Sequence, residues 1–168
     1  METNLSTDIR PGTYTIDPAR STCRLLATHA FGLKPVTATM AVRGGTVTVD
    51  VDADRCTASA SLDAATFRSD DARRDRDITG KRFLDAAHHP VIAFRSTRRE
   101  GRRILGALSV RGVSSDVALE VAGCVPTVDG HLITASCVVD RVVAGVPGGR
   151  GIIARPVRIT LEVCLVPA

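Results

Sequence analysis

Apolar and polar residues alternate at every second position through most of this chain, and this alternation is the feature that most constrains its fold. Val47, Val49 and Val51 are separated by threonine and aspartate, and residues 157–165 continue the pattern near the C-terminus. A period of two places the apolar side chains on one face of a β-strand. Eight or nine such segments at regular spacing predict an all-β sandwich or barrel.

Three short segments predict where the strands reverse. Gly44 and Gly45 sit between two alternating segments, and glycine supplies the positive φ angles of a tight turn. Residues 98–103, Arg-Arg-Glu-Gly-Arg-Arg, predict an exposed hairpin tip, and residues 111–115 predict the next reversal. The sequence therefore predicts antiparallel strands joined by short turns.

Small side chains on two strands predict a cavity inside the fold. Near the N-terminus, residues 14–17 predict a short strand that enters a turn at Pro18, and residues 22–31 predict a longer strand. One face of the longer strand carries Cys23, Leu25, Ala27, His29 and Phe31. A later strand buries Cys56, Ala58, Ala60 and Leu62. The chain has no tryptophan and four phenylalanines, so it has little bulk to fill a barrel of about eight strands. The alternative is a packed core in which small residues lie opposite leucine and isoleucine.

One helical segment is predicted, over residues 74–89. Its apolar residues share a face at helical spacing, namely Ile78, Phe83, Leu84 and Ala87. Pro90 ends the pattern, and Asp77 is a candidate for the helix cap. Because so short a helix is unstable alone, we expect it to pack against the sheet or to cover one end of a structure built from sheet.

The length of 168 residues predicts one domain over residues 13–168, preceded by a flexible tail over residues 1–12. The first residues lack the apolar run of a secretory signal, and no apolar stretch is long enough to span a bilayer. The five cysteines are odd in number, widely spaced and without a Cys-x-x-Cys pair. These features predict a cytoplasmic protein with reduced cysteines.

Polar motifs give only weak candidates for a site. His29 shares a face with Leu25 and Ala27, so its imidazole is a candidate for contacting a ligand's polar head, or for a core histidine bonded to a neighbouring group. Adjacent His88 and His89 point to opposite sides of an extended segment, which argues against a metal site. The hairpin arginines lack interleaved aromatic residues, so we expect no nucleic-acid binding.

The order of motifs resembles the YceI-like family of lipocalin-like, lipid-binding proteins, from Tyr14 to about Val166. The first block is Tyr14-Thr15-Ile16-Asp17 with Ser21, followed by the strand that ends in His29. Phe83-Leu84-Asp85 precedes the block His89-Pro90-Val91-Ile92-Ala93-Phe94-Arg95-Ser96, and Gly106-Ala107-Leu108-Ser109-Val110-Arg111-Gly112-Val113 follows. The chain departs from the family pattern in Val36-Thr37-Ala38-Thr39-Met40 and lacks the aromatic residue expected after Arg141.

The resemblance implies an extended eight-stranded antiparallel barrel around an apolar tunnel, with no catalytic residues. The ligand would be an isoprenoid, an isoprenoid quinone or a fatty-acid-like lipid, and no cofactor or metal is expected. The expected ligand contacts are Cys23, Leu25, Ala27, His29, Phe31, Ala58, Ala60, Leu62, Phe94, Leu108 and Val110. A homodimer is left open.

Three functional hypotheses follow. The first is a non-enzymatic carrier or store for a long apolar amphiphile, which both the small-residue faces and the family blocks favour. The second is an enzyme that uses the same cavity with His29 as acid or base, although the sequence offers His29 no evident polar partner. The third is a module that binds anionic surfaces through the hairpin arginines, in a manner sensitive to salt.

Overall fold

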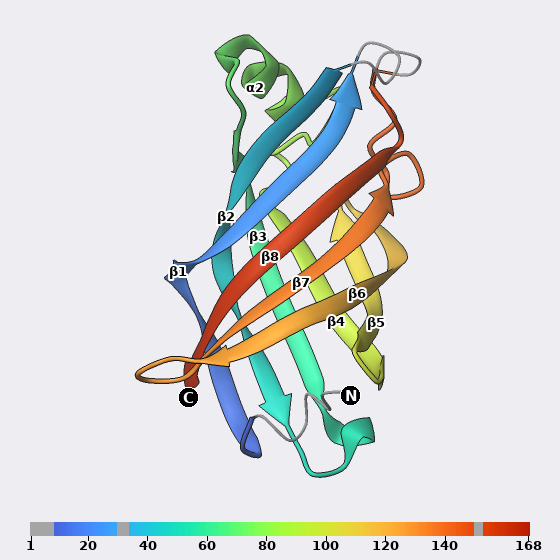
Figure 1. The fold of residues 1–168 in the computed structure, drawn as a ribbon. Helices are drawn as coiled ribbons and strands as arrows, with labels where there is room; N and C mark the ends of the chain where they lie inside the picture. The colour runs from blue at the N-terminus through green and yellow to red at the C-terminus, as the bar shows by residue number, and fades with distance from the viewer. Residues whose placement is uncertain (1–8, 30–33, 150–152) are drawn as a thin grey trace.

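Eight antiparallel strands form a closed barrel in the computed structural model, which describes residues 9–29, 34–149 and 153–168 (Figure 1). Each strand pairs with its neighbour in sequence, and the last pairs with the first. The strands are β1 (Gly12–His29), β2 (Lys34–Val49), β3 (Thr57–Arg68), β4 (Val91–Glu100), β5 (Arg103–Val110), β6 (Val113–Pro126), β7 (His131–Asp140) and β8 (Pro156–Pro167). The predicted all-β barrel is confirmed.

The predicted break at Pro18 is wrong, because β1 continues from Gly12 to His29 as one strand. Pro18 lies in an irregular part of the strand, where the register of pairing with β8 shifts between Asp17 and Thr22. The Ser21 hydroxyl occupies this bulge: it donates to the Asp17 carbonyl at 2.6 Å and accepts from the Cys164 amide at 3.0 Å. A proline that cannot donate to the ladder is thereby accommodated without ending the strand.

The predicted reversal at Gly44 and Gly45 is also wrong. Both glycines lie inside β2, where its pairing with β3 shifts between Val42 and Gly44. A Cβ atom on residue 45 would lie 2.7 Å from Cδ1 of Ile16 and would also meet the Ser59 carbonyl oxygen. The glycines therefore form a β-bulge and allow neighbouring strands to pack closely. The dipeptide alone does not distinguish this role from that of a turn.

The helix is shorter and earlier than predicted. Helix α2 (Ala72–Thr79) begins after Asp71, whose side chain accepts from the amides of Arg73 and Arg74, so Asp71 is the cap and the assignment of Asp77 is wrong. The helix ends at Gly80, and residues 81–89 continue in turns instead of helix. A short 3-10 helix, η1 (Ala53–Arg55), links β2 to β3.

Residues just beyond α2 form part of the core. Phe83 and Leu84 are buried, whereas Ala87 is exposed and does not share their face. In Figure 1, α2 and this segment lie at one end of the barrel, opposite the end that carries η1. The expectation that the helical segment covers an end of the barrel is therefore confirmed.

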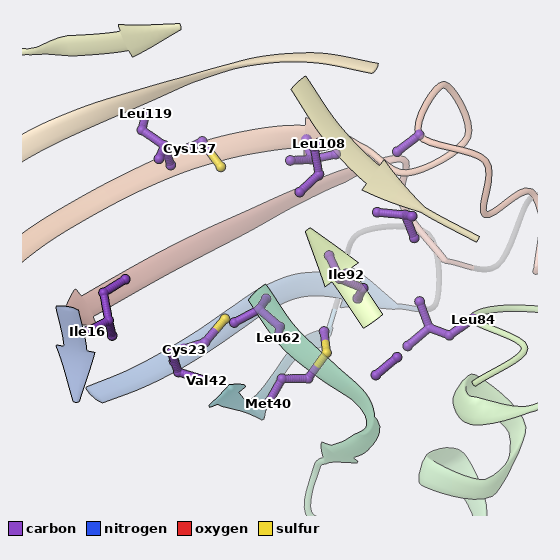
Figure 2. Close-up of a cluster of buried hydrophobic side chains, with 14 of the residues drawn as sticks. Ile16, Cys23, Met40, Val42, Leu62, Leu84, Ile92, Leu108, Leu119 and Cys137 are labelled. Carbon is purple, nitrogen blue, oxygen red and sulfur yellow. The ribbon is translucent and has the colours of Figure 1, made fainter. Parts of the chain in front are cut away.

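Inward side chains from all parts of the sheet make up a single core, in which Leu165 and Cys23 are the largest of the fully buried side chains (0% and 1% exposed). Figure 2 shows Leu62, Ile92 and Met40 on one wall, and Leu108, Leu119 and Cys137 on another, directed toward a common interior. Ile9, within the predicted tail, is also buried in this core; residues 1–8 of that tail lie outside the described residues.

Candidate functional site

An apolar cavity of about 450 Å³ occupies the half of the barrel that α2 covers. We call it the upper cavity. All eight strands contribute to its wall, through side chains that include Leu25, Met40, Leu62, Ile92, Leu108, Leu119, Cys137 and Ile159. Its volume falls within the range of about 300 to 1,000 Å³ that is usual for small-molecule sites. The expectation of a cavity rather than a filled core is therefore confirmed by the structure.

The cavity exists because short side chains face it where longer ones would fill it. Ala27, Ala38 and Ala60 line its wall, and its only aromatic residues in the described part of the chain are Phe67, Phe83 and Phe94. In a barrel of eight strands, the size of the inward residues decides whether the interior is filled. The alanines therefore leave space that leucine or phenylalanine would occupy.

The mouth of the upper cavity lies beside α2. Asp71, Arg73 and Asp77 line this end and are exposed, so the cavity reaches solvent there. Arg74 also lines it, and its guanidinium forms an ion pair with Asp70 at 2.9 Å. Hydrogen bonds from the Arg73 and Arg74 amides to its carboxylate hold the pKa of Asp71 below the ordinary value of 3.8. Charged groups thus surround one end of an otherwise apolar space.

Arg141 holds together described parts of the segment that follows β7 and that also lines the upper cavity. The side chain is 7% exposed and lines the upper cavity. Its guanidinium donates to the carbonyls of Val146 at 2.7 Å and Ile153 at 2.8 Å, and also to those of Gly148 and Ala154. A planar fork of donors can satisfy several carbonyls at once, so one residue ties together the described residues 146–148 and 153–154.

A smaller cavity of about 130 Å³, the lower cavity, lies in the other half of the barrel. Its wall includes Ile9, Ile16 and Ala58, and it extends to Arg98 and Gly101 at the β4–β5 turn. Both of these last residues are exposed, so the lower cavity approaches solvent near the hairpin tip.

The residues predicted to contact a ligand do not all lie together. Seven of them line the upper cavity: Leu25, Ala27, Ala60, Leu62, Phe94, Leu108 and Val110. Ala58 lines the lower cavity instead, and Cys23 is buried in the core without lining either cavity. The His29 side chain and Phe31 lie outside the described residues. Whether any of these residues contacts a ligand stays a prediction.

Sequence reasoning missed the mouth of the site and the parts of its wall that β2, β6, β7 and β8 supply. Cys137 and Val139 both line the upper cavity from β7, and their alternation with Val138 could have identified them. The contributions of Arg141 and Ile153 depend on how the 141–155 loop folds, for which the sequence has no periodic signal. A pattern of strands thus predicts cavity walls better than it predicts the mouth.

The chemistry of the upper cavity offers no strong nucleophile or metal centre in the described residues. Burial raises the pKa of the Cys137 thiol to about 11, which keeps it protonated at neutral pH. Outside the cavity, His88 contacts Asp85 at 2.9 Å, and this hydrogen bond lowers the pKa of the Asp85 carboxyl. The described residues contain no cluster of three or more metal-ligating side chains. What the arrangement can do best is enclose an apolar molecule.

A closed eight-stranded antiparallel barrel around an apolar cavity, with charged groups at one mouth, has the lipocalin-like fold. The family model for the YceI-like domain matches residues 14–165. The chain therefore belongs to the YceI-like family. A search of curated proteins found no significant match.

Solved structures share this fold at low sequence identity. BcnA of Burkholderia cenocepacia superposes with a TM-score of 0.74 at 20% identity, over 88% of this chain and 98% of that one. A polyisoprenoid-binding domain from Saccharophagus degradans, implicated in plant cell wall breakdown, gives 0.73 at 10% identity, over 95% of this chain and 100% of that one. A YceI protein of Campylobacter jejuni gives a TM-score of 0.53 at 17% identity, over 73% of this chain and 80% of that one.

None of the helices in the described residues is long and apolar enough to cross a membrane.

Proposed function

We propose that this protein binds a long apolar amphiphile, such as an isoprenoid, without chemically changing it, and carries or stores it. The observation that carries the proposal is the apolar upper cavity of about 450 Å³, to which every strand contributes. Isoprenoid alcohols, isoprenoid quinones and fatty-acid-like lipids have tails suited to such a space. The polyisoprenoid-binding domain with the same fold supports the isoprenoid class.

The amphiphile would bind with its tail inside the barrel and its polar head beside α2. Each methylene removed from water contributes about 0.8 kcal/mol, so tail burial supplies most of the affinity. A polar head buried among the aliphatic side chains would lose its hydrogen bonds with water. At the mouth, the exposed groups of Asp71, Arg73 and Asp77 and solvent itself keep it hydrated.

The enzyme hypothesis has less support. Among the residues described around the upper cavity, ionisable groups gather at the mouth, and the Cys137 thiol is held protonated by burial. A general acid or base needs a reacting group within hydrogen-bond reach and a pKa near the working pH. The described wall deep in the barrel is aliphatic or aromatic around Leu62 and Leu108, which favours binding over catalysis.

The hypothesis of an arginine-mediated surface is weakened by the partners that the hairpin arginines already have. Arg98 pairs with Glu100 at 2.9 Å, and Arg103 pairs with Glu120 at 3.0 Å. Arg99 donates to the Gly101 carbonyl at 2.8 Å. The two carboxylates of these pairs offset half of the positive charge of the four hairpin arginines, which lowers the attraction of this surface for phosphate groups.

Titration of delipidated protein with defined lipids tests the proposal. Protein that has been freed of lipid with organic solvent and refolded should take up one molecule of geranylgeraniol or of a long fatty acid. Native mass spectrometry measures this uptake. Organic extraction of the complex should recover the lipid with its chemical structure intact, which distinguishes a carrier from an enzyme. Refolded protein with a β-rich circular dichroism spectrum that takes up no lipid would contradict the proposal.

Two further parts of the proposal concern location and assembly. We propose a cytoplasmic protein, because an odd number of widely spaced cysteines with no Cys-x-x-Cys pair suits a reducing compartment. Cell fractionation with an antibody against the protein tests the location. A homodimer is compatible with the fold, and light scattering at several concentrations measures the oligomeric state directly.

A further inference from the structure

The upper and lower cavities meet at a ring of side chains near the middle of the barrel. Five residues line both cavities: Ala60 from β3, Phe94 from β4, Leu119 from β6, and Leu161 and Val163 from β8. We call this ring the constriction. Because it draws on strands from around the barrel, it separates two spaces stacked along one interior and not two unrelated surface pockets.

Phe94 supplies the only aromatic ring in the constriction. Its neighbour across the β3–β4 ladder is Ala60, so a small side chain stands beside the ring. On the other side, the ring packs against Gly106 of β5: a Cβ atom there would lie 2.6 Å from Cε2 and 2.7 Å from Cζ of Phe94. The absence of a side chain at residue 106 therefore provides the space in which the ring lies.

The barrier between the cavities thus consists of side chains, of which Phe94 is the largest, and not of backbone. Phe94 is only half-buried, and it has open volume on both sides, about 450 Å³ above and 130 Å³ below. A ring with free volume on both sides can change rotamer at moderate cost, whereas a backbone constriction cannot. The lower cavity, less than one third of the volume of the upper one, would become available only when the ring moves.

We infer that Phe94 sets the chain length of the bound amphiphile. This inference rests on the proposed function and adds a specificity-determining residue to it. A tail that ends at the constriction fills the upper cavity without disturbing the ring. A longer tail must displace the ring from Gly106 before its last carbons reach the lower cavity. Affinity should therefore rise with tail length until the tail reaches Phe94, and then level off.

Isoprenoid alcohols of increasing length test this inference, with geraniol, farnesol, geranylgeraniol and solanesol as the probes. Each added isoprene unit that enters the upper cavity should strengthen binding by about tenfold or more, since each methylene alone contributes about fourfold. In Phe94→Ala the two cavities join, so the plateau should move to tails longer by at least one isoprene unit. Affinity for the shortest probe, geraniol, should change little.

Matched variants separate chain-length control from general damage. Phe67→Ala removes the same ring from the upper cavity only, so its plateau should stay at the wild-type length. Adding Ala58→Phe to Phe94→Ala fills the lower cavity and should restore the wild-type plateau. If Phe94→Ala does not fold, Phe94→Leu provides a smaller opening and a smaller shift in the same direction.

The outcomes distinguish this inference from the function on which it rests. If wild type and Phe94→Ala bind the series with the same plateau, the role of Phe94 is overturned while the carrier function stands. If Phe67→Ala shifts the plateau as far as Phe94→Ala, the constriction has no special role. If the folded wild type binds none of the alcohols, both the proposed function and the length control fail.

Discussion

The guanidinium of Arg20 holds the carboxylate of Asp129 in a two-pronged contact, with Nη1 to Oδ1 at 3.0 Å and Nη2 to Oδ2 at 2.8 Å. The same guanidinium donates through Nε to Asp17 at 2.8 Å. It thereby links the bulge of β1 to the turn between β6 and β7. For Asp129 and for Asp17 alike, hydrogen bonding from the Arg20 side chain is the main cause that lowers the pKa of the carboxyl.

These ion pairs predict a loss of stability in acid. A carboxyl whose pKa is lowered by folding stabilises the folded state above its unfolded pKa, and that contribution disappears as the pH falls through the folded pKa. Asp129→Asn should therefore lower the melting temperature by about one to three degrees at neutral pH. The difference from wild type should shrink as the pH falls below the ordinary pKa of 3.8.

Thermal unfolding from neutral pH down to about pH 3 measures this effect. Asp116→Asn is the control, because Asp116 lies exposed on β6 and forms no ion pair with another described residue. Because the Arg20 and Asp129 side chains are about half exposed, added salt should also reduce the difference. A difference that persists unchanged at pH 3 would contradict the account of this contact.

Replacement of Arg141 should destabilise the mouth of the upper cavity. Lysine keeps the charge but lacks the planar fork, so Arg141→Lys should leave some loop carbonyls without donors. We expect a loss of about 1 to 3 kcal/mol in the free energy of unfolding, because buried polar groups would be left unsatisfied. Urea denaturation measures the loss. Arg155→Lys is the control, since that guanidinium is exposed and pairs with Asp140 at the surface; equal losses would refute the special role of Arg141.

A bulky side chain in the upper cavity should prevent ligand uptake at little cost in stability. Ala38 is buried at the cavity wall of β2, so the ring of Ala38→Phe would enter space that the protein does not fill. In a filled core the same change would cost about 1 to 3 kcal/mol through forced rotamers and backbone shifts. Lipid binding and melting temperature are measured together.

The control for Ala38→Phe is Ala41→Phe, which adds the same ring to the exposed outer face of the same strand. It should bind lipid as the wild type does. An Ala38→Phe protein that is strongly destabilised would indicate a packed interior, and a stable one that still binds would place the ligand elsewhere.

Buried thiols predict which cysteines resist alkylation. Burial raises the pKa of Cys23 to about 12 and that of Cys137 to about 11, so neither forms an appreciable fraction of thiolate at pH 8. Iodoacetamide should therefore leave both unmodified in the native protein and modify them in urea, as peptide mass spectrometry can show. Cys56, which is less buried at the η1 turn, should react before Cys23 and Cys137. Rapid native modification of Cys23 would contradict the closed packing of β1 against β8.

The strands could be predicted because each residue's face follows from a local period of two. Val157 and Ile159 alternate with exposed Arg158, and both line the upper cavity as the pattern requires. Leu108 and Val110, which the family resemblance placed in the interior, also line the upper cavity. A periodic pattern can be identified without knowing which strand lies alongside, so it can be read from the sequence alone.

Features that depend on contacts across strands could not be predicted in this way. Gly45 looks like a turn residue until the approach of Ile16 and Ser59 is known. Phe94 could be assigned to the interior, but its position between two cavities follows from its packing against Gly106 on another strand. The helix boundary was wrong because Asp71 and Asp77 are both acceptable caps, and the structure uses the earlier one.

The most direct test of the central claim is native mass spectrometry of protein purified from its native host in detergent-free buffer, before and after organic extraction. We predict a complex of one protein chain with one apolar lipid, which extraction reduces to the bare chain and which Ala38→Phe never forms. Fragmentation of the extracted lipid should show an isoprenoid or other long apolar tail. Wild-type protein that is folded, β-rich and at the mass of the bare chain in every preparation would contradict the account.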